Sequence, residues 1–323
     1  MATKCATPEG TARYRERFAD RLASNHFSRQ HGLVLSSIGI GTYLGNADEA
    51  TDLAYTRSVV RAVQLGVNVI DTAANYRFQR SERSIGQALQ VLTSEHGIAR
   101  EELVICTKGG YLPFNGAPPR NVREYVNETF VRPGIASFED IVAGSHCMTP
   151  SYLQSQLDQS LQNMGLECVD VYYIHNPESQ LQYVSEQEFY HRLKLAFERL
   201  EENRRQGKLA HYGVATWNGF RVPTNSGGHH SLARMVEIAR EVGGEQHGFH
   251  FIQLPFNVAM PEGTTAVDEA QRLGVAVVTS ASLLQGRIPP QTAIEFVRST
   301  PGITTALIGM SRVEHVEENL AAD

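Results

Sequence analysis

Apolar residues gather in short runs along the chain, and each run is followed by a segment with helical periodicity. Most of these runs are nearly continuous in apolar character, which is typical of strands buried on both faces of a parallel sheet. The pattern therefore predicts strands at residues 36–42, 67–71, 103–107, 169–174, 211–216, 250–254, 275–279 and 304–309.

The segments between the runs carry apolar residues at intervals of three and four, and several end on glycine. Gly66 and Gly165 each follow such a segment, as glycine often does after the last turn of a helix. Eight strands, each followed by a helix, predict a single (β/α)8 TIM barrel domain over residues 1–323. The predicted helices cover residues 49–66, 149–165, 189–208, 228–243, 263–273, 290–299 and 311–322, and a further one begins near Ser81.

The main alternative for this alternation is a doubly wound sheet that binds phosphate at a glycine-rich turn. Residues 39–45 read GIGTYLG, which has the spacing GxGxxxG instead of GxGxxG. No helix begins at the third glycine, and Asp71 comes too far along the chain to be the acidic residue of that motif. The barrel is the better interpretation.

Segments outside the strand–helix repeat are also predicted. Residues 1–33 precede the first strand as an N-terminal extension. Residues 109–148 and 217–228 are long connections that leave the carboxyl ends of strands, the face at which barrel enzymes carry their active sites. Segment 109–148 is interpreted as an active-site insertion and not merely a mobile surface loop. It is expected to supply an apolar wall from Tyr111, Phe114, Tyr125 and Phe130.

Composition narrows the possible partners and the compartment. The net charge of −6 makes nucleic acid an unexpected partner. No run of about 18 apolar residues predicts a membrane span, and no apolar signal sequence begins the chain, so a cytoplasmic protein without a membrane partner is expected. The four cysteines lack CxxC spacing, so neither a disulfide framework nor a metal site is predicted, and Cys106 and Cys168 are expected to be buried free thiols.

Four residues with complementary chemistry follow three consecutive predicted strands. Asp71 ends the second strand with Tyr76 just beyond it, Lys108 ends the third, and His175 ends the fourth. Neighbouring strand ends meet on one rim of a barrel, so these side chains should converge. An ammonium lowers the pKa of a nearby phenol from its usual value of about 10, and a carboxylate would hold that ammonium. An imidazole could orient a carbonyl oxygen toward the phenol for proton transfer.

Each of these residues also has a plainer interpretation. Asp71 could simply cap the next helix, and Tyr76 or His175 could be packed and hydrogen-bonded without a catalytic role. Lys108 could instead be a Schiff-base nucleophile of an aldolase-like barrel. The conjunction of all four residues on consecutive strand ends favours the shared site.

Two motifs give the chain a resemblance to a known family. Residues 71–76, DTAANY, match a D-T-A-x-x-Y motif, and residues 81–89, SERSIGQAL, match the segment that follows it. With Lys108 and His175 in the expected places, the chain resembles the aldo-keto reductases from about Gly39 to Asn319. The resemblance implies that Tyr76 is the general acid or base and that hydride passes between a nicotinamide cofactor, NADPH, and a small-molecule carbonyl or alcohol, such as an aldehyde, ketone or sugar.

The resemblance also implies which residues contact the cofactor. Ser311 and Arg312 are expected at the 2′-phosphate, which favours NADPH over NADH, and Gln253 is expected at the nicotinamide carboxamide. Ala215-Thr216 stand where relatives have Ser-Asn, and Ser280 stands where many have a stacking aromatic ring. The full set of expected cofactor-binding residues is Gly41, Thr42, Tyr43, Asp71, Gln253, Ser280, Ser311, Arg312, His315, Glu318 and Asn319.

Two alternatives within the resemblance remain open. One is a dehydrogenase that runs in the opposite direction and oxidises a sugar hemiacetal to a lactone. The other is a binding protein that senses the nicotinamide cofactor with little turnover, similar to potassium-channel β subunits. Trp217 and Phe256 are the candidates to replace the missing stacking ring. The sequence leaves the substrate, the direction and the oligomeric state open.

Overall fold

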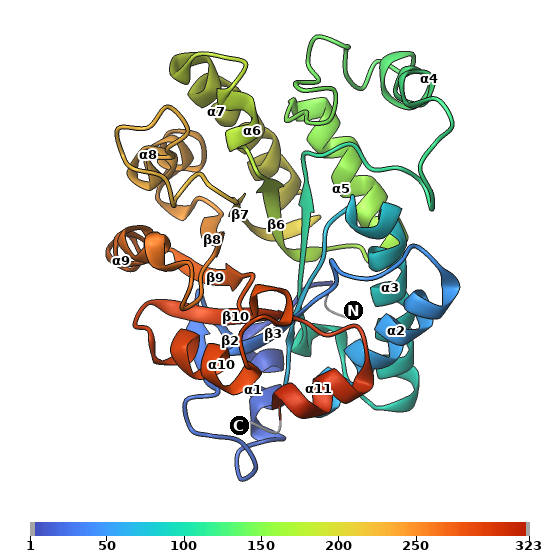
Figure 1. The fold of residues 1–323 in the computed structure, drawn as a ribbon, viewed down its shortest axis with the longest axis vertical. Coiled ribbons are helices and arrows are strands. Elements are labelled where there is room, and N and C mark those ends of the chain that lie inside the picture. Colours follow the sequence, from blue (N-terminus) through green and yellow to red (C-terminus); the bar gives the residue numbers. More distant parts are fainter. Residues whose placement is uncertain (1–3, 321–323) are drawn as a thin grey trace.

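A closed barrel of parallel strands forms the centre of the molecule. The structure is a computed structural model that describes residues 4–320. Within these residues eight strands pair in the cyclic order β10-β3-β4-β5-β6-β7-β8-β9, and helices surround them (Figure 1), which confirms the predicted (β/α)8 TIM barrel. The strands are β3 (Ile38–Gly41), β4 (Val69–Asp71), β5 (Val104–Gly109), β6 (Val169–His175), β7 (Leu209–Ala215), β8 (Phe249–Pro255), β9 (Ala276–Ser280) and β10 (Ile303–Gly309).

The continuous apolar runs arise because the strands are buried on both faces. Val104 and Cys106 of β5 pack inside the barrel with Val171 of β6. Ile105 and Ile174 point the other way, into the larger core between the strands and the helices. Successive side chains of a strand alternate between its two faces, so both sets must be apolar.

A helix of eight or more residues follows each barrel strand, close to the predicted positions, and a short helix α6 (Glu178–Leu181) precedes α7. Several begin at a side chain that caps them: Asp48 accepts a hydrogen bond from the backbone NH of Thr51, and Ser231 accepts one from the backbone NH of Arg234. Ser231 explains why α8 begins later than predicted. The predicted residues 321–322 of the last helix lie outside the described residues. The helices are α2 (Glu49–Gln64), α3 (Arg80–Glu95), α5 (Pro150–Met164), α7 (Glu186–Arg205), α8 (Leu232–Gly243), α9 (Thr264–Leu273), α10 (Pro290–Ser299) and α11 (Val313–Leu320).

The N-terminal extension contains structure that the sequence pattern did not predict. Helix α1 (Pro8–Glu16) is followed by a hairpin of β1 (Phe27–Gln30) and β2 (Leu33–Ser36). Leu33 and Leu35 of the hairpin join the core inside the barrel, so the hairpin closes its amino-terminal end. Four-residue strands are too short to give a clear periodic signal.

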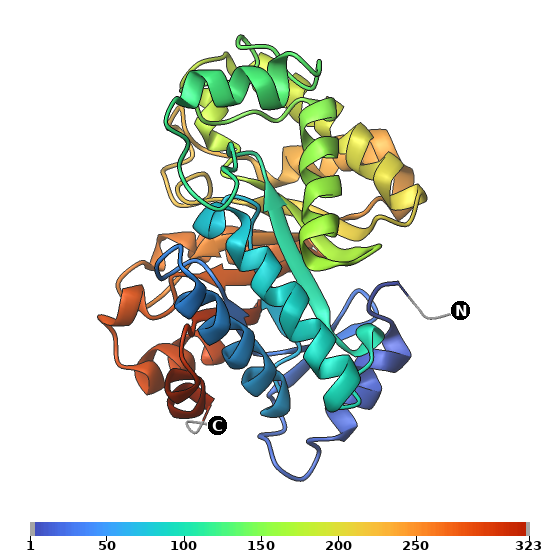
Figure 2. The same cartoon turned by 90° about the vertical axis from the view of Figure 1, so that its right-hand side faces the viewer.

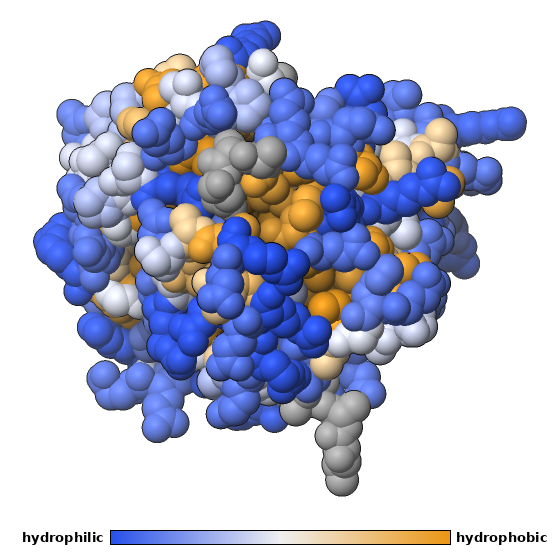
Figure 3. Space-filling view, turned by 90° about the horizontal axis from the view of Figure 1, so that it is seen from below, coloured by the Kyte–Doolittle hydropathy of each residue, from blue (hydrophilic) through white to orange (hydrophobic). Residues whose placement is uncertain are grey.

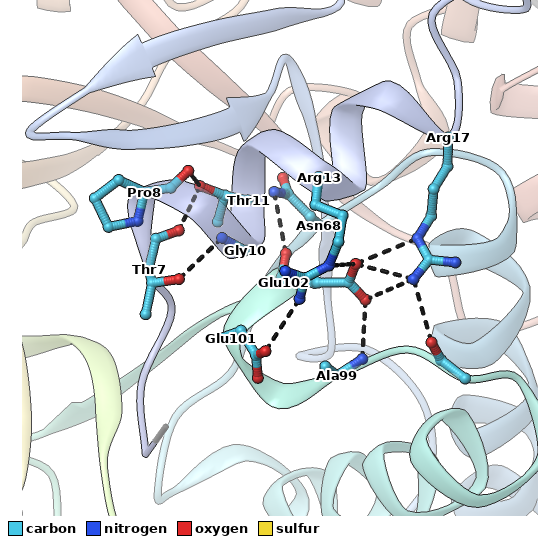
Figure 4. A network of polar contacts seen from close by, with 11 residues as sticks. Thr7, Pro8, Gly10, Thr11, Arg13, Arg17, Asn68, Ala99, Glu101 and Glu102 are labelled. Atoms are coloured by element: carbon cyan, nitrogen blue, oxygen red, sulfur yellow. Dashed lines mark hydrogen bonds and ion pairs between the residues drawn. The ribbon is translucent and has the colours of Figure 1, made fainter. Parts of the chain in front are cut away.

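A buried carboxylate attaches α1 to the barrel. Glu102 is fully buried and accepts hydrogen bonds from Arg13, from Arg17 and from the backbone NH of Ala99 (Figure 4). The Arg17 guanidinium contacts both carboxylate oxygens, at 2.9 and 3.1 Å. Charge-assisted hydrogen bonds of this kind are stronger than neutral ones. They compensate the cost of burying this carboxylate beneath the helix.

A disulfide between Cys5 and Cys168 corrects two expectations. Cys168 was predicted to be a free thiol, and no disulfide framework was predicted, but the two residues are bonded with their Cα atoms 5.5 Å apart. They meet because the N-terminal segment crosses the start of β6, where the backbone NH of Ala6 donates to Asp170 at 2.6 Å. Cys106 is a buried free thiol, as predicted, and so is Cys147.

The insertion at residues 109–148 folds around a small core of its own. It contains α4 (Val122–Val126) and a π-helical turn (Asn127–Val131), and it lies on the opposite side of the barrel from the N-terminal segment (Figure 2). Phe130 is buried in this core against Tyr152, with their ring centroids 5.3 Å apart, and Tyr125 packs on it. Most of the aromatic residues expected to form a wall therefore stabilise the insertion itself.

One face of the molecule is mainly hydrophilic. Seen from below, hydrophilic side chains cover most of the molecule around a smaller recessed apolar area (Figure 3). In residues 4–320 no helix is long and apolar enough to cross a membrane. No group of three or more His, Cys, Asp or Glu side chains within this range could hold a metal ion.

Candidate active site

Three adjacent strands bring the predicted tetrad to one rim of the barrel. Asp71 is the last residue of β4, Lys108 lies near the end of β5, and His175 is the last residue of β6. Tyr76 follows β4 in a short helical turn. Asp71, Tyr76 and His175 line one cavity of about 1030 Å³, and Lys108 is buried beside it with 1% of its surface exposed. The predicted convergence of the four residues is therefore present in the structure.

A buried ion pair forms the base of this site. The Lys108 ammonium contacts one carboxylate oxygen of Asp71 closely and donates to the carbonyl of Thr72 at 2.7 Å. The second oxygen of Asp71 accepts a hydrogen bond from the Gln253 amide at 2.9 Å. Burial alone would lower the pKa of Lys108, but the charges of Asp71 and Tyr76 outweigh it and the pKa is raised. A charged amine is a poor Schiff-base nucleophile, so the geometry disfavours the aldolase interpretation.

Tyr76 stands above this ion pair and between two other aromatic rings. The Lys108 nitrogen lies 5.0 Å from the centre of its ring. The ring centroid of Tyr76 is 5.8 Å from that of His175 and 5.0 Å from that of Tyr43. Burial raises the pKa of Tyr76 more than Lys108 lowers it, so the net shift is upward and not downward as expected. The phenol therefore stays protonated at neutral pH and can donate its proton.

His175 is neutral in this environment. Burial, with a contribution from the charge of Lys108, holds its pKa well below the usual value of 6.5. Its Nδ1 atom is buried without a hydrogen-bond partner among the described residues. A neutral imidazole that carries one N–H can donate a hydrogen bond to an uncharged substrate oxygen.

A left-handed turn directly after Tyr76 is a feature that the sequence did not predict. Arg77, Phe78 and Gln79 have φ angles of 48°, 59° and 72°, although none is glycine. Such conformations cost of order 1 kcal/mol or more per residue and persist only where surrounding contacts impose them. Here the Arg77 guanidinium is paired with Asp52 at 2.5 Å. The ion pair and the left-handed turn together fix the path of the backbone directly after Tyr76.

The cavity runs from the tetrad to the start of α11. Its wall includes every residue expected to bind cofactor except Arg312. Arg312 is exposed and contacts the wall residue His315, with 2.7 Å between its guanidinium nitrogen and His315 Nε2. The expected residues that line the cavity are Gly41, Thr42, Tyr43, Asp71, Gln253, Ser280, Ser311, His315, Glu318 and Asn319.

Two wall residues fit the carboxamide of a nicotinamide ring. The hydroxyl of Thr216 is buried at the cavity wall and has no hydrogen-bond partner among the described residues. Gln253 lies on the neighbouring strand β8, and its side-chain NH2 group donates to Asp71. Its side-chain carbonyl is left available for another donor. Of the two candidate stacking rings, Trp217 lines the cavity, whereas Phe256 is stacked on Phe296 away from it.

Sequence analysis missed several residues of the cavity wall. Tyr111 does line it, but Asn176 directly after His175, and residues 281–284, Gly286 and Arg287 after β9, were not predicted. Glu178 also acts here, because one of its oxygens accepts the backbone NH groups of Trp217 and Asn218 at 2.6 and 2.9 Å. The motif NPE directly after His175 was the available signal, since polar residues that follow a barrel strand often serve the site.

Comparison with known proteins agrees with this fold. The sequence profile of the Aldo/keto reductase family matches residues 37–288, and the chain belongs to this family of oxidoreductases. The NADP-bound crystal structure of an aldo/keto reductase from Klebsiella pneumoniae is 18% identical, with a TM-score of 0.59, 90% of this chain covered and 87% of that chain. A glycerol dehydrogenase structure from Gluconobacter oxydans has a TM-score of 0.66 at 17% identity, with 93% and 90% covered.

Curated relatives share sequence at a low level over most of the chain. A Schizosaccharomyces pombe protein named "Putative voltage-gated potassium channel subunit beta" is 25% identical, and the match covers 92% of this chain and 87% of that protein. L-glyceraldehyde 3-phosphate reductase of Escherichia coli is 23% identical, with 90% and 85% covered. NADH-specific methylglyoxal reductase of Escherichia coli is 28% identical over 44% of this chain and 39% of its own length.

Proposed function

We propose that the protein is an NADPH-dependent oxidoreductase that interconverts a small-molecule carbonyl, such as an aldehyde, ketone or sugar, and its alcohol. The observation that carries this proposal is the convergence of Asp71, Tyr76, Lys108 and His175 on one cavity that extends to the start of α11. Membership of the Aldo/keto reductase family and the NADP named with the Klebsiella pneumoniae structure support it. When bound, the nicotinamide would supply or accept the hydride.

The protein's own residues would handle the substrate oxygen and its proton. His175, neutral and facing Tyr76, would donate a hydrogen bond that orients the carbonyl oxygen. Tyr76 would then give its proton to that oxygen, since its raised pKa keeps the phenol protonated at neutral pH. Lys108, held by Asp71, would stabilise the phenolate left behind. In the alcohol-oxidising direction Tyr76 would accept the proton.

Residues along the cavity would hold the cofactor in an extended arrangement. Thr216 and Gln253 would bind the carboxamide, because both have polar atoms available at the wall. Ser311 and Arg312 at the start of α11 would bind the 2′-phosphate, where a guanidinium and backbone NH groups favour an anion. This last pair makes NADPH the proposed cofactor instead of NADH.

Fluorescence titration of Trp217 tests the proposal directly. It is the only tryptophan of the chain and it lines the cavity, so a bound nicotinamide should quench it. We expect tight quenching by NADPH, and we expect Arg312→Ala to weaken NADPH about tenfold while NADH changes little. Arg205→Ala is the matched control, because that arginine is exposed and its ion pair among residues 4–320 is with Glu202 on its own helix. If the folded protein binds neither nucleotide, the proposal is wrong.

The similarity to the Schizosaccharomyces pombe protein supports a second candidate, a cofactor-sensing subunit with little turnover. Single-turnover kinetics distinguish the two. If the protein is an enzyme, pre-bound NADPH should be oxidised on mixing with members of an aldehyde panel, and the oxidised cofactor should then be exchanged rapidly for NADPH. If the protein is a sensor, NADPH should bind tightly and be released slowly, with no more than one turnover for any compound tested.

A further inference from the structure

A buried histidine on the insertion contacts the backbone of the proposed substrate-orienting residue. His146 has no exposed surface, and its Nε2 atom lies 2.7 Å from the carbonyl oxygen of His175. This carbonyl belongs to the last residue of β6, and the next residue, Asn176, has a left-handed φ of 44°. The NH of the peptide after His175 still donates to the carbonyl of Ala215 on β7 at 2.6 Å, and His146 supplies the hydrogen-bond donor for its carbonyl.

The direction of every hydrogen bond behind His146 is fixed by an arginine. The Arg192 guanidinium, which can only donate, lies 2.8 Å from the Gln180 side-chain oxygen. The Gln180 NH2 group is thereby oriented to donate to His146 Nδ1, at 2.9 Å. Nδ1 must then be the unprotonated nitrogen, so Nε2 carries the hydrogen that is donated to His175. Glu188 holds Arg192 in turn, at 2.7 Å.

Gly110 and Tyr111 pack around the hydrogen bond between His146 and His175. Gly110 has no side chain, and a Cβ atom there would lie 2.9 Å from His146 Nε2 and 3.0 Å from the His175 carbonyl oxygen. The Tyr111 ring packs edge-on against both imidazoles, with centroids 5.2 Å from His146 and 5.1 Å from His175. The Tyr111 hydroxyl accepts a hydrogen bond from Asn176 at 3.1 Å.

We infer that His146 is a positioning residue for His175, through which the 109–148 insertion sets the orientation of the substrate carbonyl. This inference rests on the proposed function, since it concerns the residue proposed to orient the substrate. His146 does not line the cavity, and its hydrogen bond reaches the site through the peptide that carries His175. A displacement of about 1 Å at an orienting group can reduce a reaction rate about a hundredfold.

Substitutions at His146 separate positioning from packing. In His146→Gln the amide nitrogen can replace Nε2 as donor, whereas His146→Asn is one methylene too short and His146→Leu has no donor. We expect kcat/KM to fall about tenfold to a hundredfold in the Asn and Leu variants and to recover mostly in the Gln variant. NADPH affinity, measured by Trp217 fluorescence, should stay within about twofold. If His146→Leu does not fold, the polar Gln and Asn variants give the same comparison.

A double-mutant cycle supplies the decisive result. In a His175→Ala background the substitution His146→Leu should have almost no further effect on kcat/KM, because the backbone carbonyl that His146 contacts remains but the imidazole that it positions is absent. An equal loss in both backgrounds, or wild-type kinetics in the His146→Leu and His146→Asn variants, would overturn the inference.

A measurement without substrate keeps this test separate from the proposed function. The imidazole nitrogen resonances of His175 should shift in His146→Leu and stay near their wild-type positions in His146→Gln. If these resonances are unchanged in His146→Leu, the positioning role is wrong even for an active reductase. If they shift as expected but the wild type binds no nucleotide, the proposed function fails while the contact stands.

Discussion

The ion pair between Asp71 and Lys108 should be the most costly polar contact of the site to break. Both side chains are buried, with 3% and 1% of their surface exposed, and Lys108 has no other anionic partner in direct contact among the described residues. The substitution Asp71→Asn preserves the shape of the side chain but removes its charge. Loss of one partner from a buried pair costs about 3 to 5 kcal/mol, because the other charge remains buried.

This cost can be converted into a melting temperature. For a chain of 323 residues the entropy of unfolding is about 0.7 kcal/mol/K near 60 °C, so a loss of about 3 kcal/mol corresponds to about 4 °C. The measurement is thermal unfolding followed by circular dichroism at pH 7. The double variant Asp71→Asn with Lys108→Met should recover part of the loss, because it removes the unpaired charge.

Glu128→Gln is the matched control. It breaks the pair between Glu128 and Arg132, whose side chains are 52% and 67% exposed. Exposed pairs contribute about 0 to 1 kcal/mol, so its melting temperature should change by no more than about 1.5 °C. If Asp71→Asn is no more destabilising than this control, or if the double variant is less stable than Asp71→Asn alone, the assigned role of the buried pair is wrong.

Three further predictions concern other parts of the molecule. Tyr76→Phe should lower kcat about a hundredfold or more, with NADPH binding retained in fluorescence titrations, because the proposed proton donor is lost. The pKa of His146 is lowered by burial from 6.5 to about 4, so neutral His146 stabilises the fold above pH 6.5 and this contribution is lost as the pH falls toward 4. Chemical denaturation should show that, between pH 7 and pH 4.5, the free energy of unfolding of the wild type falls by about 2 to 3 kcal/mol more than that of His146→Gln. Glu178 and His175 are the titratable residues that act on His146. Thiol titration of the unfolded, unreduced protein should find two free thiols and not four, and Cys5→Ser should lower the free energy of unfolding by about 2 to 5 kcal/mol. Four titratable thiols, or equal acid sensitivity of the two proteins, would contradict the last two predictions.

The barrel could be predicted from the sequence because its signal is repetitive. Every strand is buried on both faces, so each predicted run coincides with a strand to within a few residues. The tetrad followed from topology alone, since neighbouring strands must place Asp71, Lys108 and His175 on one rim. No side-chain geometry was needed for that step.

The features that were missed depend on contacts between distant residues. Cys5 and Cys168 are separated by 163 positions, and nothing in their local sequence marks them as partners. The upward shift in the pKa of Tyr76 depends on how much its burial outweighs Lys108, which spacing cannot show. Phe130 was assigned to the cavity wall because aromatic residues serve walls and cores equally well, and only the packed structure distinguishes them.

The closure of the barrel has a consequence for how the protein matures. The ring closes where β10 pairs with β3, which joins residues near the two ends of the chain. The cavity lies across this seam, with Gly41, Thr42 and Tyr43 on one side and Ser311 to Asn319 on the other. A ribosome must therefore release the chain through Asn319 before this cavity can exist. Any ligand that spans the seam would hold the first and last strands together and would protect a newly made chain from reopening.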